Sequence, residues 1–135
     1  MRNRLAALAA AVLIASVAHA QNADDNTPEG QAAVKPGEAA RFDSDSIADY
    51  GGLRRFEVRV AWGDSGQPAP ADHRTRKVRY VADCKANTLA VAAVAVFDRS
   101  GMLLKTMLTP PGAAEPQAPA PGSQEERWLR EVCKT

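Results

Sequence analysis

Thiols, imidazoles and aromatic rings are scarce in this chain, and their scarcity argues against several classes of function. The only two cysteines, Cys84 and Cys133, are far apart and form no Cys-x-x-Cys motif, which argues against disulfide-exchange chemistry. Beyond residue 20 the one histidine is His73, which has no second histidine or free thiol to complete a zinc site. Aromatic residues make up 5% of the sequence, so the stacking surfaces of single-stranded nucleic-acid binders are not predicted. A phosphate-binding glycine loop is also missing, and we expect no cofactor.

Long apolar runs are lacking too, apart from one near the N-terminus. Residues 1–20, MRNRLAALAAAVLIASVAHA, combine a charged start, an apolar run over residues 5–17 and a final Ala-His-Ala. This pattern is typical of a secretory signal peptide cleaved after Ala20. The apolar run is too short for a bilayer, which requires roughly 20 apolar residues. Since no cysteine follows it to carry a lipid, we expect a periplasmic or secreted protein with no membrane span or lipid anchor.

Neither sign of charge is in excess once this signal peptide is removed. Residues 21–135 hold 15 basic side chains (17 less Arg2 and Arg4) against 16 acidic ones, a net charge of 15 − 16 = −1. A nearly neutral chain does not indicate nucleic acid as a partner. Its length suits one domain with a small core. In an exported chain of this kind, the two cysteines are expected to pair with each other.

The predicted organisation is a disordered leader over residues 21–40 and a single domain over residues 41–135. The leader is rich in Gly, Pro and acid and has one larger aliphatic residue, Val34. Strand-like alternation begins in RRFEVRVAW (54–62) and returns in RKVRYVADC (76–84). After the turn KANT, the segment TLAVAAVAVF (88–97) is apolar on both faces, which favours a central strand, although its alanines would also suit a helix. The turn DRSG (98–101) then leads to a last strand, MLLKTML (102–108).

A C-terminal helix is predicted after a proline-rich surface linker, TPPGAAEPQAPAPG (109–122). Ser123 and Glu126 have the spacing of a capping box, in which each side chain accepts from the other residue's backbone amide. The helix carries one apolar stripe, formed by Trp128, Leu129, Val132 and Cys133. Cys133 would therefore face the body of the protein and pair with Cys84. The predicted fold class is α+β: an antiparallel β-sheet with a C-terminal α-helix packed on it and tied by one disulfide.

Two motifs that suggest chemistry have simpler explanations. Residues 63–66, GDSG, occur around the nucleophile of chymotrypsin-like serine proteases, but there the histidine base precedes the serine, whereas His73 follows Ser65. A serine followed by Gly and Pro between two alternating segments is typical of a hairpin connection. Asp43, Asp45 and Asp49 resemble the oxygen spacing of a calcium loop but lack its glycine and terminal glutamate. We therefore predict no catalytic residue, no metal site and a non-enzymatic protein.

Basic residues gather in the two segments on either side of the GDSG connection. They are Arg54, Arg55, Arg59, Arg74, Arg76, Lys77 and Arg79. If the segments pair as strands, Arg55, Arg59, Lys77 and Arg79 form a basic strip on the water-facing side of the sheet. Such a strip favours anionic glycans, anionic lipid headgroups or acidic proteins. The alternative is an ordinary solvated face neutralised by Glu57 and nearby aspartates.

The order of these segments resembles the surface-adhesin protein E-like family of small exported bacterial proteins. The similarity covers about residues 42–134 and rests on FDSDSI, RFEVRV, KVRYVADCKANT, FDRSG, the proline-rich stretch and PGSQEERWLREVC. The family pattern pairs a strand-end Asp-Cys with a cysteine in a terminal helix, here Asp83-Cys84 and Cys133. The resemblance implies an antiparallel sheet with a disulfide-fixed C-terminal helix, exposure outside the cytoplasm, and binding of host matrix or plasma proteins.

Three functional hypotheses follow from these features. The leading one is an exported, non-enzymatic binding protein for an extracytoplasmic protein or anionic glycan, using the exposed sheet face or an edge strand. The second is a periplasmic inhibitor or accessory subunit of an envelope enzyme, which would insert loop 63–72 or 109–122 into its target. The third, an enzyme, requires an activity that depends on Ser65 or His73. Exposed sheet edges could also pair between two copies of the chain, so a homodimer is a further possibility.

Overall fold

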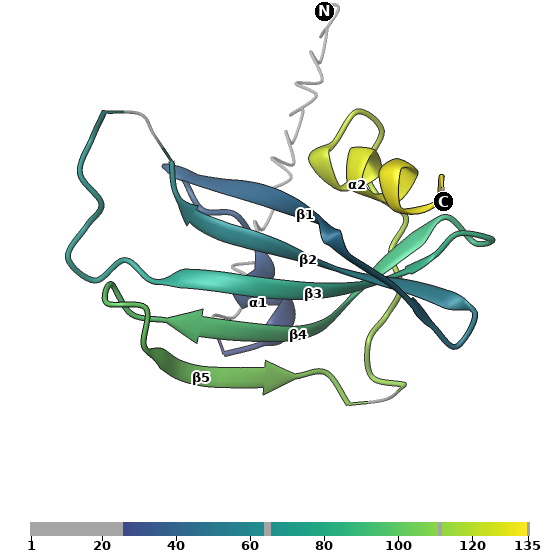
Figure 1. The fold of residues 1–135 in the computed structure, drawn as a ribbon, viewed down its shortest axis with the longest axis horizontal. Helices are drawn as coiled ribbons and strands as arrows, with labels where there is room; N and C mark the ends of the chain where they lie inside the picture. The colour runs from purple at the N-terminus through teal and green to yellow at the C-terminus, as the bar shows by residue number, and fades with distance from the viewer. Residues whose placement is uncertain (1–25, 64–65, 111, 135) are drawn as a thin grey trace, which may run out of the picture.

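The computed structural model describes residues 26–63, 66–110 and 112–134. Its elements, in chain order, are α1 (Pro28–Ala32), β1 (Glu38–Tyr50), β2 (Leu53–Trp62), β3 (Thr75–Asp83), β4 (Thr88–Phe97), β5 (Leu103–Leu108) and α2 (Gln124–Val132). The five strands form one antiparallel sheet in the order β1-β2-β3-β4-β5 (Figure 1). The predicted α+β class is therefore confirmed. The predicted signal peptide, residues 1–20, lies outside the described residues.

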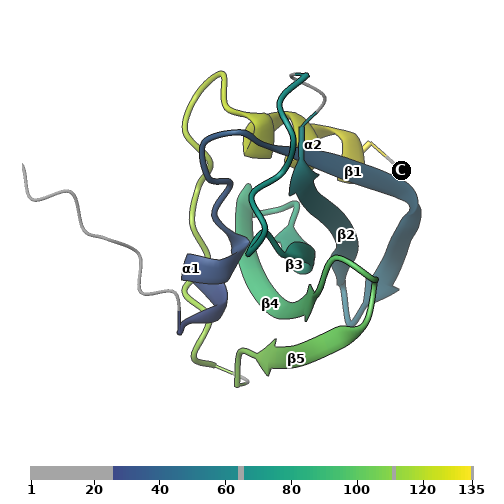
Figure 2. The ribbon, with the colours of Figure 1, turned by 90° about the vertical axis from the view of Figure 1, so that its left-hand side faces the viewer.

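The two faces of the sheet differ because side chains alternate along each strand. In β2 and β3 every second residue is buried: Phe56, Val58 and Val60 on β2, and Val78 and Tyr80 on β3. Both helices cover this apolar face, with α1 against β3 and β4 and α2 against β1 and β4 (Figure 2). In the described part of the chain, no helix covers the opposite face of the sheet. We call this opposite face the uncovered face.

Aromatic rings hold α2 on the sheet. Phe56 stacks on Tyr80 at a centroid distance of 5.4 Å, and Trp128 of α2 approaches Phe56 edge-on at 6.5 Å. Trp128, Leu129 and Val132 are buried, as the apolar stripe predicted. Aromatic pairs of this kind add about 0.5–1.5 kcal/mol each beyond the burial of their area.

The predicted capping box at the start of α2 is only half correct. Ser123 Oγ accepts from the Glu126 backbone N–H at 3.2 Å, as expected for an N-cap. Glu126 Oε2 accepts from the Gly122 N–H at 2.6 Å, however, while the Ser123 N–H donates to the Ala120 carbonyl. The reciprocal bond is displaced by one residue because the turn before α2 already uses the Ser123 amide.

The predicted disordered leader over residues 21–40 is wrong where the chain is described. Thr27 caps a short helix, α1, by accepting from the Gly30 N–H at 3.1 Å, and Pro28 occupies its first position. Gly30 and Ala32 are buried in this helix, which packs on β4 and β3. Composition misled the prediction because small residues bury closely against an alanine-rich strand. The domain therefore begins well before residue 41.

Strand β1 was also missed by the sequence analysis. Its first half alternates, with Ala40 and Phe42 packed against the core, but a register irregularity falls between Asp43 and Ala48. The Ser46 hydroxyl accepts from the Glu57 N–H at 2.7 Å there and bridges the interrupted ladder. The interruption, together with the acidic residues, hid a strand of 13 residues from the period-2 pattern.

The predicted turns between the later strands are confirmed. The β3–β4 turn ends at Asn87, whose φ is 54°, and the β4–β5 turn contains Gly101 at φ 85°. A hydrogen bond from the Ser100 hydroxyl, joined by the backbone N–H groups of Met102 and Ser100, holds the pKa of Asp98 below its ordinary value. The chain therefore reverses between TLAVAAVAVF and the predicted last strand, which spans Leu103–Leu108.

Candidate functional site

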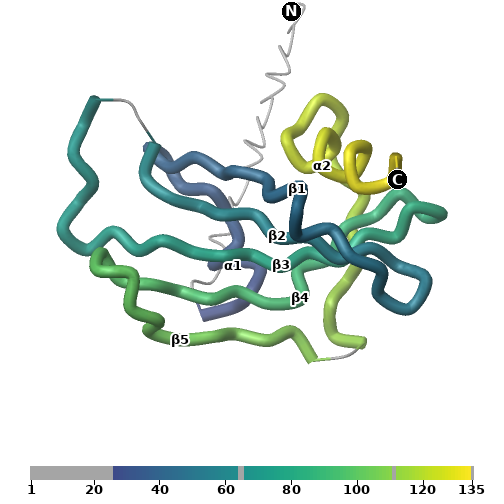
Figure 3. Tube along the Cα trace, viewed as in Figure 1, coloured from purple at the N-terminus to yellow at the C-terminus, as the bar shows by residue number. Residues whose placement is uncertain are grey.

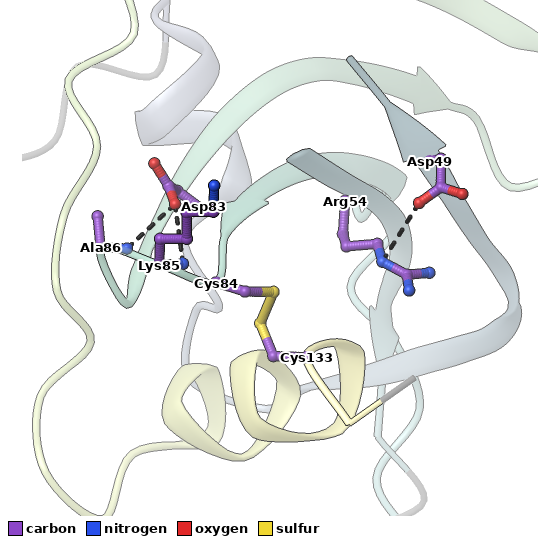
Figure 4. The surroundings of a disulfide bond; sticks show 7 residues. All are labelled: Asp49, Arg54, Asp83, Cys84, Lys85, Ala86 and Cys133. Atoms are coloured by element: carbon purple, nitrogen blue, oxygen red, sulfur yellow. Dashed lines mark hydrogen bonds and ion pairs between the residues drawn. A yellow bond between two sulfur atoms is a disulfide. The ribbon is translucent and has the colours of Figure 1, made fainter. Parts of the chain in front are cut away.

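One disulfide joins α2 to the sheet. Cys84 directly follows β3, and Cys133 is the C-cap of α2; the two Cα atoms are 5.5 Å apart (Figure 4). Next to the bond, Asp83 Oδ1 accepts from the backbone N–H groups of Lys85 and Ala86, each at 3.0 Å, which shapes the turn that carries Cys84. The predicted pairing of Cys84 with Cys133 is confirmed, and the described residues contain no free cysteine.

The uncovered face carries a row of cations that runs across three strands. Arg59 of β2 is the cross-strand partner of Lys77 on β3, and Arg41 of β1 is the partner of Arg59 on its other side. All three side chains are exposed. Like charges in directly opposed positions of an antiparallel pair destabilise a sheet. The opposed like charges of this basic row, Arg41-Arg59-Lys77, therefore do not stabilise the pairing of the three strands.

The neighbouring rows contain the other two predicted members of the basic strip. Arg79 pairs with Glu57 at 2.8 Å, so its charge is partly neutralised, and Glu57 lies opposite Arg79 in the register. Arg55 is exposed and lies opposite Val81. The four residues predicted from the sequence thus share one face, on which Arg59 and Lys77 are direct cross-strand partners. Arg41 was missed because β1 was not recognised as a strand.

Three of the seven basic residues in the original cluster do not join this face. Arg76 is 3% exposed and points to the opposite side of the sheet. Arg54 also lies on that side and pairs with Asp49 at 3.4 Å (Figure 4). Arg74 precedes β3 and lies in the connection from β2. The period of two along a strand separates neighbouring residues in this way, which clustering in sequence alone does not show.

Arg76 belongs to a buried charged cluster that the sequence analysis did not predict. Its guanidinium donates to both carboxylate oxygens of Glu38, at 2.8 and 2.6 Å, and to the Ala33 carbonyl at 3.0 Å. Glu38 Oε2 also accepts from the Lys35 N–H at 2.8 Å, and His73 Nε2 lies 3.1 Å from Glu38 Oε1. The cluster fastens the β2–β3 connection to the first residue of β1. Among the described residues, Arg76 Nε has no partner.

The surroundings of Glu38 favour its charged form. Burial by itself would raise the pKa of this carboxyl group. The hydrogen bonds from Arg76 and from the Lys35 backbone, the charge of Arg76 and the contact with His73 outweigh burial and hold the pKa below its ordinary value of 4.5. His73, a candidate base in the enzymatic hypothesis, is thus held beside a carboxylate. Ser65 lies outside the described residues.

The acidic residues considered for a calcium site do not assemble into one. Asp43 Oδ1 accepts from the Asp45 N–H at 3.1 Å, and Asp49 pairs with Arg54. Within residues 26–63, 66–110 and 112–134, no three His, Cys, Asp or Glu side chains gather in a group that could hold a metal ion. Neither α1 nor α2, the helices of that part of the chain, has the length and apolar character needed to cross a membrane.

Comparison with known proteins places this fold and its disulfide in a family. Residues 30–134 match the protein family described as surface-adhesin protein E. No curated protein and no solved structure matches the chain. The match covers most of the chain, includes both disulfide cysteines and begins within α1. The chain therefore belongs to the surface-adhesin protein E family.

Proposed function

We propose that this chain is an exported, non-enzymatic binding protein whose uncovered sheet face binds an anionic surface on an extracytoplasmic protein or an anionic glycan. The basic row Arg41-Arg59-Lys77 is the observation that carries the proposal. The family and the disulfide both indicate an exported or extracellular protein. An adhesin-like role requires a surface that is free to contact a partner, and the uncovered face meets that requirement.

The distribution of charge supports this choice of surface. The chain as a whole is nearly neutral, so attraction to a polyanion depends on local concentration of cations. Cross-strand partners lie about 4.5–5.5 Å apart, which places three positive side chains within one short line across the sheet. Local arrangements that oppose stability are expected at functional sites, where a bound ligand can compensate for them.

Charge reversal at Arg59 tests the proposal, because it separates binding from folding. The new carboxylate would lie between the cations of Arg41 and Lys77, so Arg59→Glu is expected to raise the free energy of unfolding by about 0.2–1 kcal/mol. Binding to immobilised heparin is expected to weaken at least about tenfold, an effect comparable to loss of about 1.4 kcal/mol. The affinity of the unmodified protein for heparin should fall as the salt concentration rises. The Debye screening length shortens from about 10 Å at 0.1 M salt to about 3 Å at 1 M, which weakens attraction between the cations and the polyanion.

Lys85→Glu provides a matched control. Lys85 is exposed in the β3–β4 turn, away from the basic row, and its substitution changes net charge by the same amount. Its effect on binding should stay within about twofold of the unmodified protein. If Arg59→Glu and Lys85→Glu weaken binding equally, or if neither does, the basic row is not the binding site. Binding that survives both changes but is lost on shortening loop 109–122 would favour the inhibitor or accessory-subunit hypothesis.

Export and processing form a further part of the proposal. The residue pattern of the first 20 positions supports a signal peptide cleaved after Ala20. Intact mass of the protein from its native compartment should correspond to a chain that begins at Gln21, with two alkylated thiols only after reduction. A retained N-terminus would contradict this part without affecting the binding proposal.

The last part of the proposal is that the protein forms a homodimer through its edge strand β5. Leu103 and Leu108 are 53% and 70% exposed there, and edge strands with exposed apolar side chains pair readily with other chains. We expect a homodimer in gel filtration that Leu108→Lys converts to a monomer. A monomer at high protein concentration would contradict pairing through β5.

A further inference from the structure

A second feature of the uncovered face lies at the end of the sheet nearest the disulfide. There a cavity of about 330 Å³ opens between the β1–β2 hairpin, the β3–β4 hairpin and the chain that follows β5. Leu53, Val81 and Ala90 line it from the strands, and Pro110 and Pro116 line it from the chain that follows β5. Figure 3 shows the chain after β5 running past this end of the sheet toward α2. The cavity therefore joins segments that are far apart in sequence.

The cavity presents mainly apolar surface because most of the residues that line it are aliphatic. Asp83, the one acidic residue in its wall, directs Oδ1 to the N–H groups of Lys85 and Ala86. The Thr109 hydroxyl donates to the Val91 carbonyl at 2.8 Å. A ligand would therefore meet mainly the aliphatic surface of the strands and prolines. An apolar wall of this kind recognises hydrocarbon rather than a sugar or a nucleotide.

The rim of the cavity carries positive charge and a hydroxyl group. Arg55 does not itself line the cavity, but it is the cross-strand partner of Val81, which does, and both residues lie on the uncovered face. The Arg55 side chain is exposed and has no ion pair or hydrogen bond with a described residue. Tyr50, 56% exposed, lines the cavity next to Leu53. An apolar cavity with a cation at its rim matches a molecule with a hydrocarbon chain and an anionic head.

We propose that this cavity binds a medium-chain alkyl carboxylate, with the chain between the strands and prolines and the carboxylate at Arg55 and the Tyr50 hydroxyl. One guanidinium provides two parallel N–H donors and one charge, which suit a single carboxylate. The volume is at the lower end of the roughly 300–1,000 Å³ typical of small-molecule sites, which suits one chain rather than the two chains of a phospholipid. This site is separate from the basic row and does not depend on the proposed function.

Calorimetry on the full secreted chain with a length series from octanoate to tetradecanoate tests the chain-binding part. The affinity is expected to rise about fourfold for each added methylene and then level off when the cavity is full. All ligands are kept below their micelle-forming concentrations. Ala90→Leu places a larger side chain in the cavity wall and should weaken binding at least about tenfold, with an unchanged far-ultraviolet circular dichroism spectrum.

The headgroup is tested with alcohols of the same chain lengths. Each carboxylate should bind about tenfold more tightly than its alcohol, and Arg55→Gln should abolish that difference. Arg59→Gln, further along the same strand face, is the matched control and should preserve it. The proposal is overturned if Ala90→Leu binds like the unmodified protein, or if Arg55→Gln and Arg59→Gln act alike. Ala90→Leu should leave heparin binding unchanged, so failure of this site and failure of the basic row are distinguishable.

Discussion

Removing the charge of Glu38 should destabilise the protein more than any change to its exposed ion pairs. Glu38→Gln preserves the shape of the side chain but leaves the guanidinium of Arg76 buried without its counter-charge. The side chains of Glu38 and Arg76 are 3% and 4% exposed, so water cannot replace the lost interaction. Breaking a buried pair in this way costs about 3–5 kcal/mol, whereas an exposed pair contributes about 0–1 kcal/mol.

A double-mutant cycle in urea measures this energy. Glu38→Gln and Arg76→Met are each expected to lower the free energy of unfolding by several kcal/mol. The double variant buries no unpaired charge, so we expect it to be more stable than the sum of the two single effects by about 2–3 kcal/mol. Changes in the slope of the urea transition would show whether compactness has also changed.

The pH dependence gives an independent check on the same pair. The pKa of Glu38 is lowered in the folded state, so its contribution to stability is present above its ordinary value of 4.5 and is lost as the pH falls through the lower, folded-state value. Glu38→Gln should lose less stability than the unmodified protein below pH 4.5. A strictly additive cycle, or identical acid profiles, would refute the assignment of a coupled buried pair.

Three further predictions concern the disulfide, a glycine and a tyrosine. Reduction and alkylation of the Cys84–Cys133 bond, which closes a separation of 49 residues, should cost about 4 kcal/mol in urea unfolding; a loss below about 1 kcal/mol would contradict the chain-entropy argument. Gly37→Ala should cost about 2–4 kcal/mol, since φ is 86° and the new Cβ would lie 2.7 Å from Trp62 Cζ3; Gly101→Ala, with φ 85° and open space, should cost less. Burial, with the charge of Glu125, raises the pKa of Tyr80 to about 12, so an ultraviolet titration should show a phenol ionising there that Tyr80→Phe removes.

Much of the sheet was predictable because burial of one face of a strand produces an alternation of apolar and polar residues in the sequence. Strands β2 and β3 alternate between apolar and polar residues, and the turns between β3, β4 and β5 carry their own glycine, asparagine and aspartate signals. The apolar stripe of α2 was predictable for the same reason, and the pairing of Cys84 with Cys133 was predictable because the sequence offers no other cysteine. Strand β1 and helix α1 were not predicted, because a register irregularity and small buried residues leave no periodic apolar pattern.

The candidate sites, too, were predictable only where the residues lie close together in the sequence. Arg55, Arg59, Lys77 and Arg79 could be assigned to one face from their spacing, since residues two apart on a strand point the same way. Arg41 could not be added, nor Arg76 removed, without knowing which strands are neighbours and which face α1 and α2 cover. The apolar cavity depends on the register of two hairpins and on the chain after β5.

Local sequence patterns encode the strands with clear alternation, the C-terminal helix and the two cysteines that pair. These features depend on interactions between residues close in the chain, or on the absence of any other partner. The buried pair of Glu38 and Arg76, 38 residues apart, and the row of three cations from three strands became visible only in the folded structure. Such contacts are set by strand register and by the packing of helices on one face, and local sequence carries no physical signal of either.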